Sequence, residues 1–565
     1  MIRLTELKLP LEHADDAVLK LIAKTLDVAI HQLQSHTVFK RSIDARKAEL
    51  VQVYIVDVGL SPTLEATLLA KFAGNPHIRP SPDMAYRPVG QAPASLPLRP
   101  VVVGFGPCGI FAALVLAQMG FRPIVLERGK TVRQRTKDTW GLWRKHVLNP
   151  ESNVQFGEGG AGTFSDGKLY SQIKDPRYLG RKVMDEFVKA GAPPEILVEA
   201  HPHIGTFKLV KVVENLREQI IALGGDIRFE QRVTDVLIED ATDGRHVRGL
   251  TVLEQATGQT YELRADQVVM ALGHSSRDTF TQLHARGVAM DAKPFSIGFR
   301  IEHPQSVIDR ARWGRHAGHP LLGAADYKLV HHANNGRSVY SFCMCPGGTV
   351  VAATSEPGRV VTNGMSQYSR NERNANAGIV VGIDPSDYPT DAAAFHATLG
   401  EQVSAELTPG TTHHPLAGIV LQRQLESNAY VMGGTNYNAP GQLVGDFIAG
   451  KASTQLGDVE PSYKPGVNLG DLAAALPRYA IEAIREALPA FAHKIKGFDM
   501  PDAVLTGVET RTSSPLKIPR GEDFQSVNTR GLYPAGEGAS YAGGILSAGV
   551  DGIKVAEAVA RSLLA

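Results

Sequence analysis

Cysteine is scarce in this chain, with only Cys108, Cys343 and Cys345 among 565 residues. So few cysteines exclude the disulfide framework that stabilises small secreted domains. No stretch approaches the roughly 20 apolar residues of a membrane-spanning helix, and the first residues lack the basic segment and apolar core of a signal peptide. We therefore expect a cytoplasmic protein with no membrane contact.

An excess of charge of either sign is also lacking. The chain has 59 basic and 58 acidic residues, which gives a net charge of +1. This balance provides no general electrostatic reason to bind nucleic acid or an anionic membrane. Two neighbouring cysteines alone fall short of a zinc site, so we predict no metal. The expected partner is a small-molecule substrate, and the composition leaves the oligomeric state open.

The N-terminal part differs in pattern from the rest. Alternating polar and apolar residues at 3–9 and 49–58 predict strands, and the apolar spacing at 14–25 predicts a helix. We therefore predict a small α+β domain over residues 1–80. The repeated prolines that follow predict a linker over residues 81–98.

The remainder predicts an α/β architecture. Residues 99–129 have the order buried strand, tight turn, apolar helix and second strand, which opens a Rossmann-like domain. The predicted FAD-binding domain covers residues 99–275 and returns at 501–565. A mixed α/β substrate domain is inserted at 276–500, with strand signals at 338–348 and 428–437.

The turn Gly104-Phe105-Gly106-Pro107-Cys108-Gly109 carries the first chemical signal. Such a motif is weak alone, but it follows Val101-Val102-Val103 and opens an apolar helix. Gly104 permits a tight turn, Gly106 lets the backbone approach a pyrophosphate, and Gly109 lets the helix pack closely. Glu127 ends the next strand, where it is placed to accept hydrogen bonds from ribose hydroxyls. The alternative is a glycine-rich turn without a ligand.

A C-terminal segment distinguishes FAD from NAD. Leu532 to Gly538 predict a short strand that ends in Gly536 and Glu537, and Gly543-Gly544-Ile545 open a second helix. In flavoproteins, such a strand end contacts the ribityl chain and such a helix start stabilises negative charge on reduced flavin. The alternative is a turn that packs against the first motif.

A glycine-rich loop over residues 156–168 exposes many N–H groups that could line the pyrophosphate or the flavin. A weaker signal is the strand 268–273, which ends in glycine. The predicted FAD-binding residues are Gly104, Gly106, Pro107, Cys108, Gly109, Glu127, Arg128, Gly159, Gly160, Thr163, Phe164, Ser165, Asp166, Gly167, Lys168, Val233, Ala271, Gly273, Gly536, Glu537, Gly543, Gly544 and Ile545.

Long strings make a family resemblance specific. They lie at 151–175, 293–305, 339–356, 360–381, 507–520 and 531–553. In these strings the chain resembles the uncharacterised FAD-dependent dehydrogenases, also described as NAD(P)/FAD-dependent oxidoreductases. The resemblance implies a glutathione-reductase-like FAD domain with an inserted substrate domain. Cys108 departs from the alanine that is usual in relatives, and it brings a thiol close to the cofactor.

Two pairs of residues are candidates for catalysis. Glu509 and Arg511 lie two apart in an extended segment, where Arg511 could bind an anionic substrate or form a structural ion pair. Cys343 and Cys345 on one strand face could be a redox pair or two small buried residues.

The remaining candidates are polar groups without a motif. His201, His203, His413 and His414 could be acid–base groups, although core or surface histidines are commoner, and His274 could approach the flavin. The amide-rich segment 362–378 predicts a loop of the substrate domain.

The chain has no second GxGxxG in a strand–helix context and no Cys-x4-Cys pair near the first helix. This argues against a pyridine-nucleotide disulfide reductase. We predict an FAD-dependent dehydrogenase or reductase that moves a hydride or electron pair between flavin and a small organic substrate, with NAD(P)H as a potential transient donor. The alternatives are a flavin monooxygenase, an FAD-dependent RNA-modifying enzyme and a non-catalytic FAD-binding protein.

Overall fold

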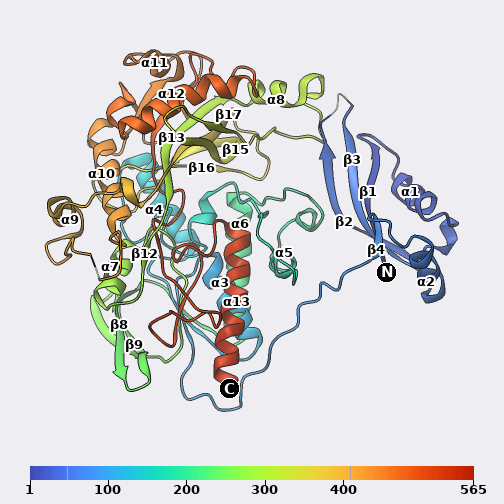
Figure 1. The fold of residues 1–565 in the computed structure, drawn as a ribbon, viewed down its shortest axis with the longest axis horizontal. Coiled ribbons are helices and arrows are strands. Elements are labelled where there is room, and N and C mark those ends of the chain that lie inside the picture. The colour runs from blue at the N-terminus through green and yellow to red at the C-terminus, as the bar shows by residue number, and fades with distance from the viewer. Residues whose placement is uncertain (47–48, 408) are drawn as a thin grey trace. The chain divides into compact units, whose positions relative to one another are not determined.

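The computed structural model describes residues 1–46, 49–407 and 409–565 (Figure 1). The chain forms two compact units. Unit 1 contains Met1–Arg87 and Lys168–Ile204, and unit 2 contains Pro88–Gly167 and Gly205–Ala565. The predicted boundaries had assigned residues 168–204 to the FAD-binding domain. The local sequence does not show to which unit such an inserted segment belongs, because contacts between residues far apart in the chain determine it.

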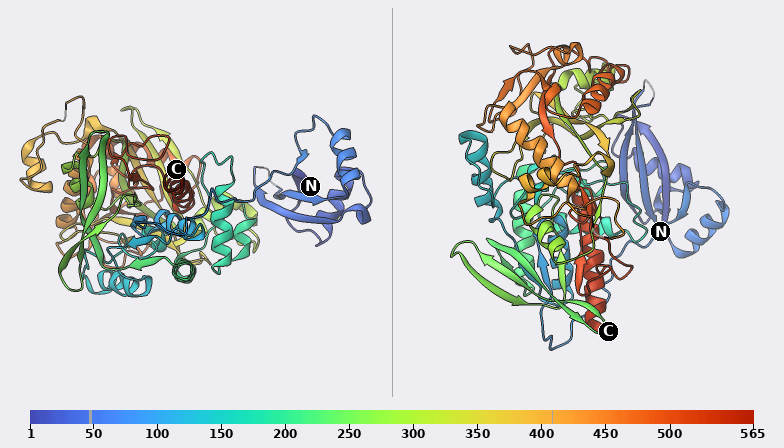
Figure 2. Two further views of the ribbon diagram at one scale, coloured as in Figure 1. Left: turned by 90° about the horizontal axis from the view of Figure 1, so that it is seen from below. Right: turned by 60° about the vertical axis from the view of Figure 1, so that its left-hand side comes forward.

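Unit 1 is built on an antiparallel sheet with the strand order β2-β3-β1-β4. Its chain order is strand, helix, strand, strand, helix, strand, the ferredoxin-like arrangement. Figures 1 and 2 show both helices on one face of this sheet, where Ile22 and Leu68 join the core formed by Val56 and Leu4. The elements are β1 (Ile2–Pro10), α1 (Ala17–Leu26), β2 (Ser35–Asp44), β3 (Val51–Gly59), α2 (Pro62–Lys71) and β4 (Ile78–Pro80).

The inserted part of unit 1 adds to the edge of this sheet. The backbone N–H of Arg41 in β2 donates to the carbonyl of Val198 at 2.6 Å, and the N–H of Ala200 donates back to Arg41 at 2.9 Å. This part contains the helix α5 (Leu179–Lys189) and the short η3 (Pro194–Leu197).

Unit 2 contains a parallel five-stranded sheet with the order β22-β11-β5-β6-β7. Central β5 lies between β6 and β11, so the strand order reverses beside it, and ligands bind at such a switch point in open α/β sheets. The strands are β5 (Val101–Val103), β6 (Ile124–Leu126), β7 (Asp226–Arg228), β11 (Val268–Met270) and β22 (Leu532–Pro534).

Two helices pack together against this sheet. Every residue of α3 (Pro107–Gln118) from Cys108 to Ala117 is buried, so this helix is apolar on all sides. The long α13 (Ile545–Leu564) packs closely against α3, because Gly552 has no side chain. A Cβ at that position would lie 2.3 Å from the Cys108 carbonyl oxygen. The C-terminal end of α13 is marked in Figures 1 and 2.

The inserted domain of unit 2 is built on an eight-stranded mixed sheet. Its order is β14-β15-β17-β13-β20-β18-β19, and β16 pairs with β15. The strands are β13 (Phe295–Pro304), β14 (Val330–His332), β15 (Ser338–Ala352), β16 (Thr362–Ser366), β17 (Asn374–Ile383), β18 (Ala439–Leu443), β19 (Val467–Leu469) and β20 (Val504–Glu509). The accompanying helices are α8 (Gln305–Trp313), α9 (Ala392–Leu399), α10 (Ala417–Met432), α11 (Val444–Ala449) and α12 (Arg478–Ala492).

A three-stranded sheet and further helices complete unit 2. They are α4 (Val132–Lys145), η2 (Ala161–Phe164), α6 (Thr206–Ala222), β8 (Gln231–Ala241), β9 (Gly244–Glu254), β10 (Gln259–Arg264) and α7 (Arg277–Ala285), with a short pair β12 (Asp291–Ala292) and β21 (Leu516–Lys517). Across the described ranges, no helix is both long and apolar enough to cross a membrane.

The architecture confirms the predicted α/β fold class with its Rossmann-like domain, inserted mixed α/β domain and small N-terminal α+β domain. The predicted strand at 338–348 lies in β15. The predicted strand at 428–437 is wrong, because α10 continues to Met432 with Leu425 and Ala429 buried at helical spacing. The predicted loop at 362–378 is wrong in large part, because β16 and the start of β17 cover most of it.

Candidate functional site

The first glycine-rich turn follows β5 and leads into α3. Gly104 has φ +99°, a conformation that favours glycine, and a Cβ there would lie 2.3 Å from the carbonyl oxygen of Ala271. Gly109 sits directly over Gly104, since a Cβ on it would lie 1.9 Å from the Gly104 carbonyl. Gly106 caps α3 in extended conformation. The N-terminus of α3 therefore carries backbone N–H groups that suit an anion.

Glu127 follows β6 and holds the turn together. Its carboxylate accepts hydrogen bonds from the backbone N–H groups of Phe105 at 2.9 Å, Gly129 at 2.8 Å and Gly157 at 3.1 Å. The side chain is buried. Oε2 has one of these bonds and Oε1 has two, so Oε2 retains a lone pair for a ribose hydroxyl. Glu127 is thus a structural residue in addition to its predicted role.

The second glycine-rich loop packs directly on the first. The N–H of Gly159 donates to the Phe105 carbonyl at 2.8 Å. A Cβ on Gly160 would lie 2.8 Å from the Gly106 Cα and 3.3 Å from Pro107, and one on Gly162 would lie 2.8 Å from Ile545. The loop therefore joins the start of α3 to the start of α13.

A buried arginine fixes this loop. The guanidinium of Arg135 in α4 donates to the carbonyls of Asn153, Val154 and Glu158 at 2.6 to 2.7 Å. Burial lowers the pKa of Arg135 to about 10, although the nearby Glu127 and Glu158 carboxylates oppose this shift. With its carbonyls engaged by the arginine, the loop is held in one conformation.

The third element is the C-terminal turn after β22. A Cβ on Gly536 would lie 3.0 Å from the Cys108 Cβ and 3.2 Å from its Sγ, so the Cys108 thiol packs against this turn. Burial raises the pKa of Cys108 well above its ordinary value. Gly273, Gly543 and Gly544 are exposed, and a Cβ on any of them would meet no atom within 4 Å. Open space thus borders the ends of β11 and α13.

These three turns fit a dinucleotide. The backbones of Gly106 and Gly160 lie against each other, Gly162 packs on Ile545, and the exposed glycines line open space. Among the described residues, the buried Oγ1 of Thr163 in this loop has no hydrogen-bond partner. A buried polar atom without a partner calls for a ligand or water. The residues present therefore suit FAD.

Several other predicted residues are engaged elsewhere. The Arg128 guanidinium pairs with Glu151 at 2.9 Å and Asp278 at 2.8 Å. Buried Asp166 accepts hydrogen bonds from Ser366 and Arg370. Both side chains link segments of unit 2.

The rest of the predicted set is distributed as follows. The Ser165 Oγ donates to Gly162 at 2.6 Å and accepts from the N–H of Gly167 at 3.0 Å. Phe164 and Ala271 are buried, and Val233 is buried in β8. Lys168 belongs to unit 1, where it pairs with His203.

A polar group of side chains occupies one face of the eight-stranded sheet. Arg300 in β13 is fully buried, and its Nε lies 3.2 Å from Oε2 of Glu509 at the end of β20. The same guanidinium donates to the carbonyls of Phe342 at 3.1 Å and Cys343 at 2.8 Å. Both amide atoms of buried Asn376 in β17 lack hydrogen-bond partners within the described residues. An apolar sheet face would need none of these groups.

Two carboxyl groups of this region have perturbed pKa values. Burial raises the pKa of Glu509 to about 7, even though the Arg300 charge lowers it. Burial also raises the pKa of Glu537 to about 7, with Lys293 acting in the opposite direction. Cys343 contributes to raising both pKa values. Perturbed carboxyl groups of this kind are typical of acid–base sites.

Cys343 and Cys345 do not share a regular strand. The pairing of β15 with β17 shifts register between Phe342 and Cys345, and Cys343 has φ +43°. The two sulfurs are not joined in a disulfide, and the Cys345 thiol donates to the Cys343 carbonyl at 3.4 Å. The expectation that both side chains face one side of a strand is therefore wrong, because a bulge separates them.

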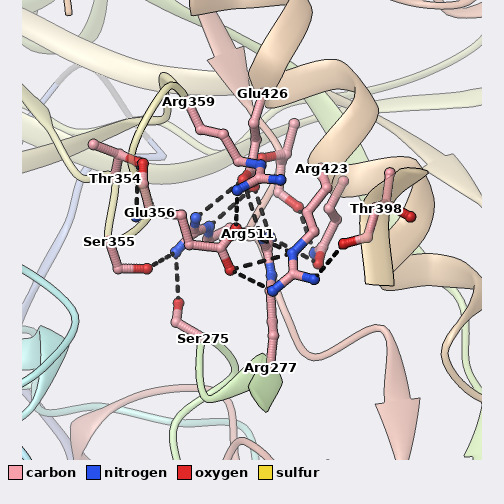
Figure 3. A network of polar contacts seen from close by, with 12 residues as sticks. Ser275, Arg277, Thr354, Ser355, Glu356, Arg359, Thr398, Arg423, Glu426 and Arg511 are labelled. Carbon is pink, nitrogen blue, oxygen red and sulfur yellow. Dashed lines mark hydrogen bonds and ion pairs between the residues drawn. The ribbon is translucent and has the colours of Figure 1, made fainter. Parts of the chain in front are cut away.

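Arg511 has surroundings different from those of Glu509. Its guanidinium donates to both Glu426 oxygens at 3.0 Å, and to the hydroxyls of Ser275 at 2.9 Å and Ser355 at 2.8 Å (Figure 3). These contacts match the structural ion pair that the sequence left open.

The histidine candidates are spread over several environments. Burial and the Arg511 and Arg277 charges lower the pKa of His274 to about 3, so this ring is neutral. Burial lowers the pKa of His414 to about 4, and its Nδ1 accepts from the N–H of Leu416 at 3.1 Å. His201 stacks on Tyr170 in unit 1. Among the described residues, no group of three or more potential ligands could hold a metal.

Sequence reasoning missed Arg300, Lys293 and Asn376 as candidates. Arg300 and Lys293 lie within the string 293–305, but no motif assigns them a role. The signal for Arg300 is burial of a charge within β13, and this burial becomes visible only when the sheet is formed, whereas Lys293 is half-buried just before that strand.

Protein families match three parts of the chain. The FAD binding domain matches residues 99–313, the C-terminal domain of FAD-dependent proteins matches 294–512, and a domain of unknown function matches 1–59. An uncharacterized protein from Clostridium beijerinckii is 44% identical over 563 residues, which cover 98% of both chains.

Solved structures give more distant similarity. A 3-ketosteroid-Δ4-(5α)-dehydrogenase from Rhodococcus jostii RHA1 is 13% identical, covering 84% of this chain and 99% of its own, with a TM-score of 0.33. A flavocytochrome c3 fumarate reductase in an open conformation is also 13% identical, covering 85% of this chain and 79% of its own, with a TM-score of 0.34. Similarity at this level adds nothing to the assignment of a reaction.

The two FAD family matches cover four of the five parallel strands and the whole eight-stranded sheet, and the relative from Clostridium beijerinckii extends over nearly the whole length. The chain therefore belongs to a family of FAD-dependent oxidoreductases that join an FAD-binding domain to this C-terminal domain.

Proposed function

We propose that the protein is a dehydrogenase or reductase that exchanges a hydride or electron pair between FAD and a small organic substrate. The observation that carries this proposal is the convergence of three glycine turns at the start of α3, where the backbones of Gly106 and Gly160 meet and Gly162 packs on Ile545 of α13. We also propose NAD(P)H as a transient donor and a cytoplasmic location, which the small cysteine content favours.

The predicted residues of the three turns would hold the cofactor. Backbone N–H groups at the start of α3 and in the loop around Gly160 would bind the pyrophosphate. The Glu127 Oε2 would accept a ribose hydroxyl, and the start of α13 would favour negative charge on the flavin. When bound, FAD supplies the two-electron chemistry.

The chain's own contribution to the reaction is proton handling. Glu509 is buried and has a pKa of about 7, so a protonated and an ionised form coexist near neutral pH. This property suits a general acid or base. We propose that Glu509 exchanges a proton with the substrate, and that the Arg300 charge 3.2 Å away limits how far burial raises the Glu509 pKa. Arg511 is left out of this role, because Glu426 and two serines engage it.

The testing experiment is an anaerobic stopped-flow spectrum of the purified protein mixed with NADPH and then with NADH. Rapid loss of the flavin band would support a nicotinamide-linked reductase. A yellow protein that neither nucleotide reduces would instead support a dehydrogenase reduced by its own substrate, and a metabolite screen for bleaching would follow. A colourless protein that takes up no added FAD would overturn the proposal.

A further inference from the structure

A buried ion-pair cluster joins α7, α10, the loop after β15 and the segment after β20. Figure 3 shows its arginines converging on two carboxylates. The cluster consists of Arg277, Glu356, Arg359, Arg423, Glu426 and Arg511. Four guanidinium groups face two carboxylates, so two positive charges are not balanced within it.

Neighbouring groups do not supply the missing negative charge. His274 faces Arg511 and Arg277 and is neutral, because its pKa is lowered to about 3. Lys293 also acts on His274 as a positive charge. Burial lowers the pKa of Arg359, and the Arg423 and Arg277 charges lower it further, whereas the Glu356 charge raises it. The surroundings of Arg359 are therefore cationic.

The two carboxylates are already engaged by several hydrogen-bond donors and cations. Glu426 is fully buried and accepts from Arg277 at 2.7 Å, from Arg511 at 3.0 Å and from the Thr510 hydroxyl at 2.9 Å. Glu356 is paired with Arg277 at 3.3 Å, Arg359 at 2.9 Å and Arg423 at 3.0 Å. Additional negative charge has to come from outside the cluster.

Two hydrogen-bond donors of the cluster are not used. In the part of the chain that the structure describes, the buried Nε atoms of Arg277 and Arg359 have no hydrogen-bond partner. Arg277 is 1% exposed, whereas Arg359 and Arg423 are 20% and 16% exposed. Thus the interior of the cluster is closed, and its solvent-facing rim carries Arg359 and Arg423. Buried charge without a counter-charge is costly, and an anion at this rim would relieve that cost.

We propose that the rim formed by Arg359 and Arg423 binds a phosphoryl dianion. A dianion matches the two unbalanced charges, and the planar guanidinium fork matches phosphate oxygens. The group could belong to a phosphorylated substrate or to the 2′-phosphate that distinguishes NADPH from NADH. Arg359 and Arg423 belong to none of the three glycine turns, and the proposal does not depend on the proposed reaction.

The test is isothermal titration of the FAD-saturated protein with inorganic phosphate against chloride at equal ionic strength. Saturation with FAD keeps phosphate out of the pyrophosphate turn. We expect saturable binding, and a loss of affinity of about tenfold or more in Arg359→Gln and Arg423→Gln, since each removes a charge-assisted hydrogen-bond donor. Arg312→Gln, an exposed arginine of α8, is the matched control and should bind like the wild type.

Wild-type protein provides a second measurement that needs no folded variant. Phosphate should protect Arg359 and Arg423 from phenylglyoxal in a peptide map, while Arg312 is modified equally with and without it. Displacement of phosphate by NADPH but not NADH would identify the nucleotide as the source, and displacement by neither would favour a phosphorylated substrate. Absence of saturable phosphate binding, or equal binding by both cluster variants, would overturn the proposal.

Discussion

Arg300 and Glu509 meet inside the eight-stranded sheet, with 3.2 Å between Nε and Oε2, yet neither atom makes a hydrogen bond within the described residues. The Arg300 guanidinium instead donates hydrogen bonds to the carbonyls of Phe342 and Cys343. The carboxyl group is therefore close to a charge but weakly held by it. This arrangement leaves burial as the larger influence on the Glu509 pKa.

The raised pKa of Glu509 makes stability depend on pH. The folded state holds the proton up to about pH 7, whereas an exposed glutamate has an ordinary pKa of 4.5. Glu509 therefore costs no stability below pH 4.5, and as pH rises from 4.5 to 7 the fold loses stability because the group ionises in the unfolded chain but stays protonated in the folded one. Relative to wild type, Glu509→Gln should gain about 3 kcal/mol in free energy of unfolding between pH 4.5 and pH 8.

This prediction is measured by denaturant titration of both proteins across that pH range. Glu401→Gln, an exposed carboxyl group, serves as the control and should show no such trend. A constant difference between Glu509→Gln and wild type would mean that the group is already ionised in the folded state at low pH.

Gly106→Glu should purify without FAD. The added side chain places a carboxylate at the start of α3, where it would occupy the pyrophosphate position and repel it. Its Cβ would lie 3.5 Å from the Gly160 Cα, an ordinary contact, so the fold should survive. The measurement is the flavin absorbance per folded protein. Gly470→Glu, at a glycine with open space around its Cβ, should remain yellow, and a yellow Gly106→Glu protein would refute the placement.

Glu127→Ala should destabilise the protein even without FAD. It leaves three backbone N–H groups, those of Phe105, Gly129 and Gly157, without their acceptor. The expected loss is about 3 kcal/mol or more, because an unsatisfied buried donor costs about 1–3 kcal/mol. Denaturant unfolding of cofactor-free protein measures it, with Glu401→Ala as control. Loss of FAD affinity alone, with unchanged apoprotein stability, would limit Glu127 to a ribose contact.

Glu426→Gln should destabilise the protein by about 3–5 kcal/mol, because it leaves the buried charges of Arg277 and Arg511 without their shared carboxylate. The exposed pair Arg478–Glu482 provides the comparison. Glu482→Gln should cost about 0.5 kcal/mol or less. Similar unfolding midpoints for both variants would show that the buried cluster contributes no more than a surface pair.

Much of the cofactor region could be predicted from the sequence. The turn from Gly104 to Gly109 and the helix starting at Ile545 are local patterns, since backbone conformation and helix dipole depend on neighbouring residues. The strand at 428–437 could not be distinguished from a helix in the same way, because a short apolar run suits either element. In the folded chain, the burial of Leu425 and Ala429 on one face favours the helix α10 over a strand.

The fold class, the three glycine turns and their order along the chain follow from local patterns of amino acids. Which charges are buried together follows from the folded chain. Glu509 and Arg511 are two residues apart in the chain, yet in the folded protein Glu509 lies beside Arg300 and Arg511 pairs with Glu426. The physical reason is that local conformation follows from near neighbours, whereas pKa values and charge balance depend on burial and on partners far away in the chain.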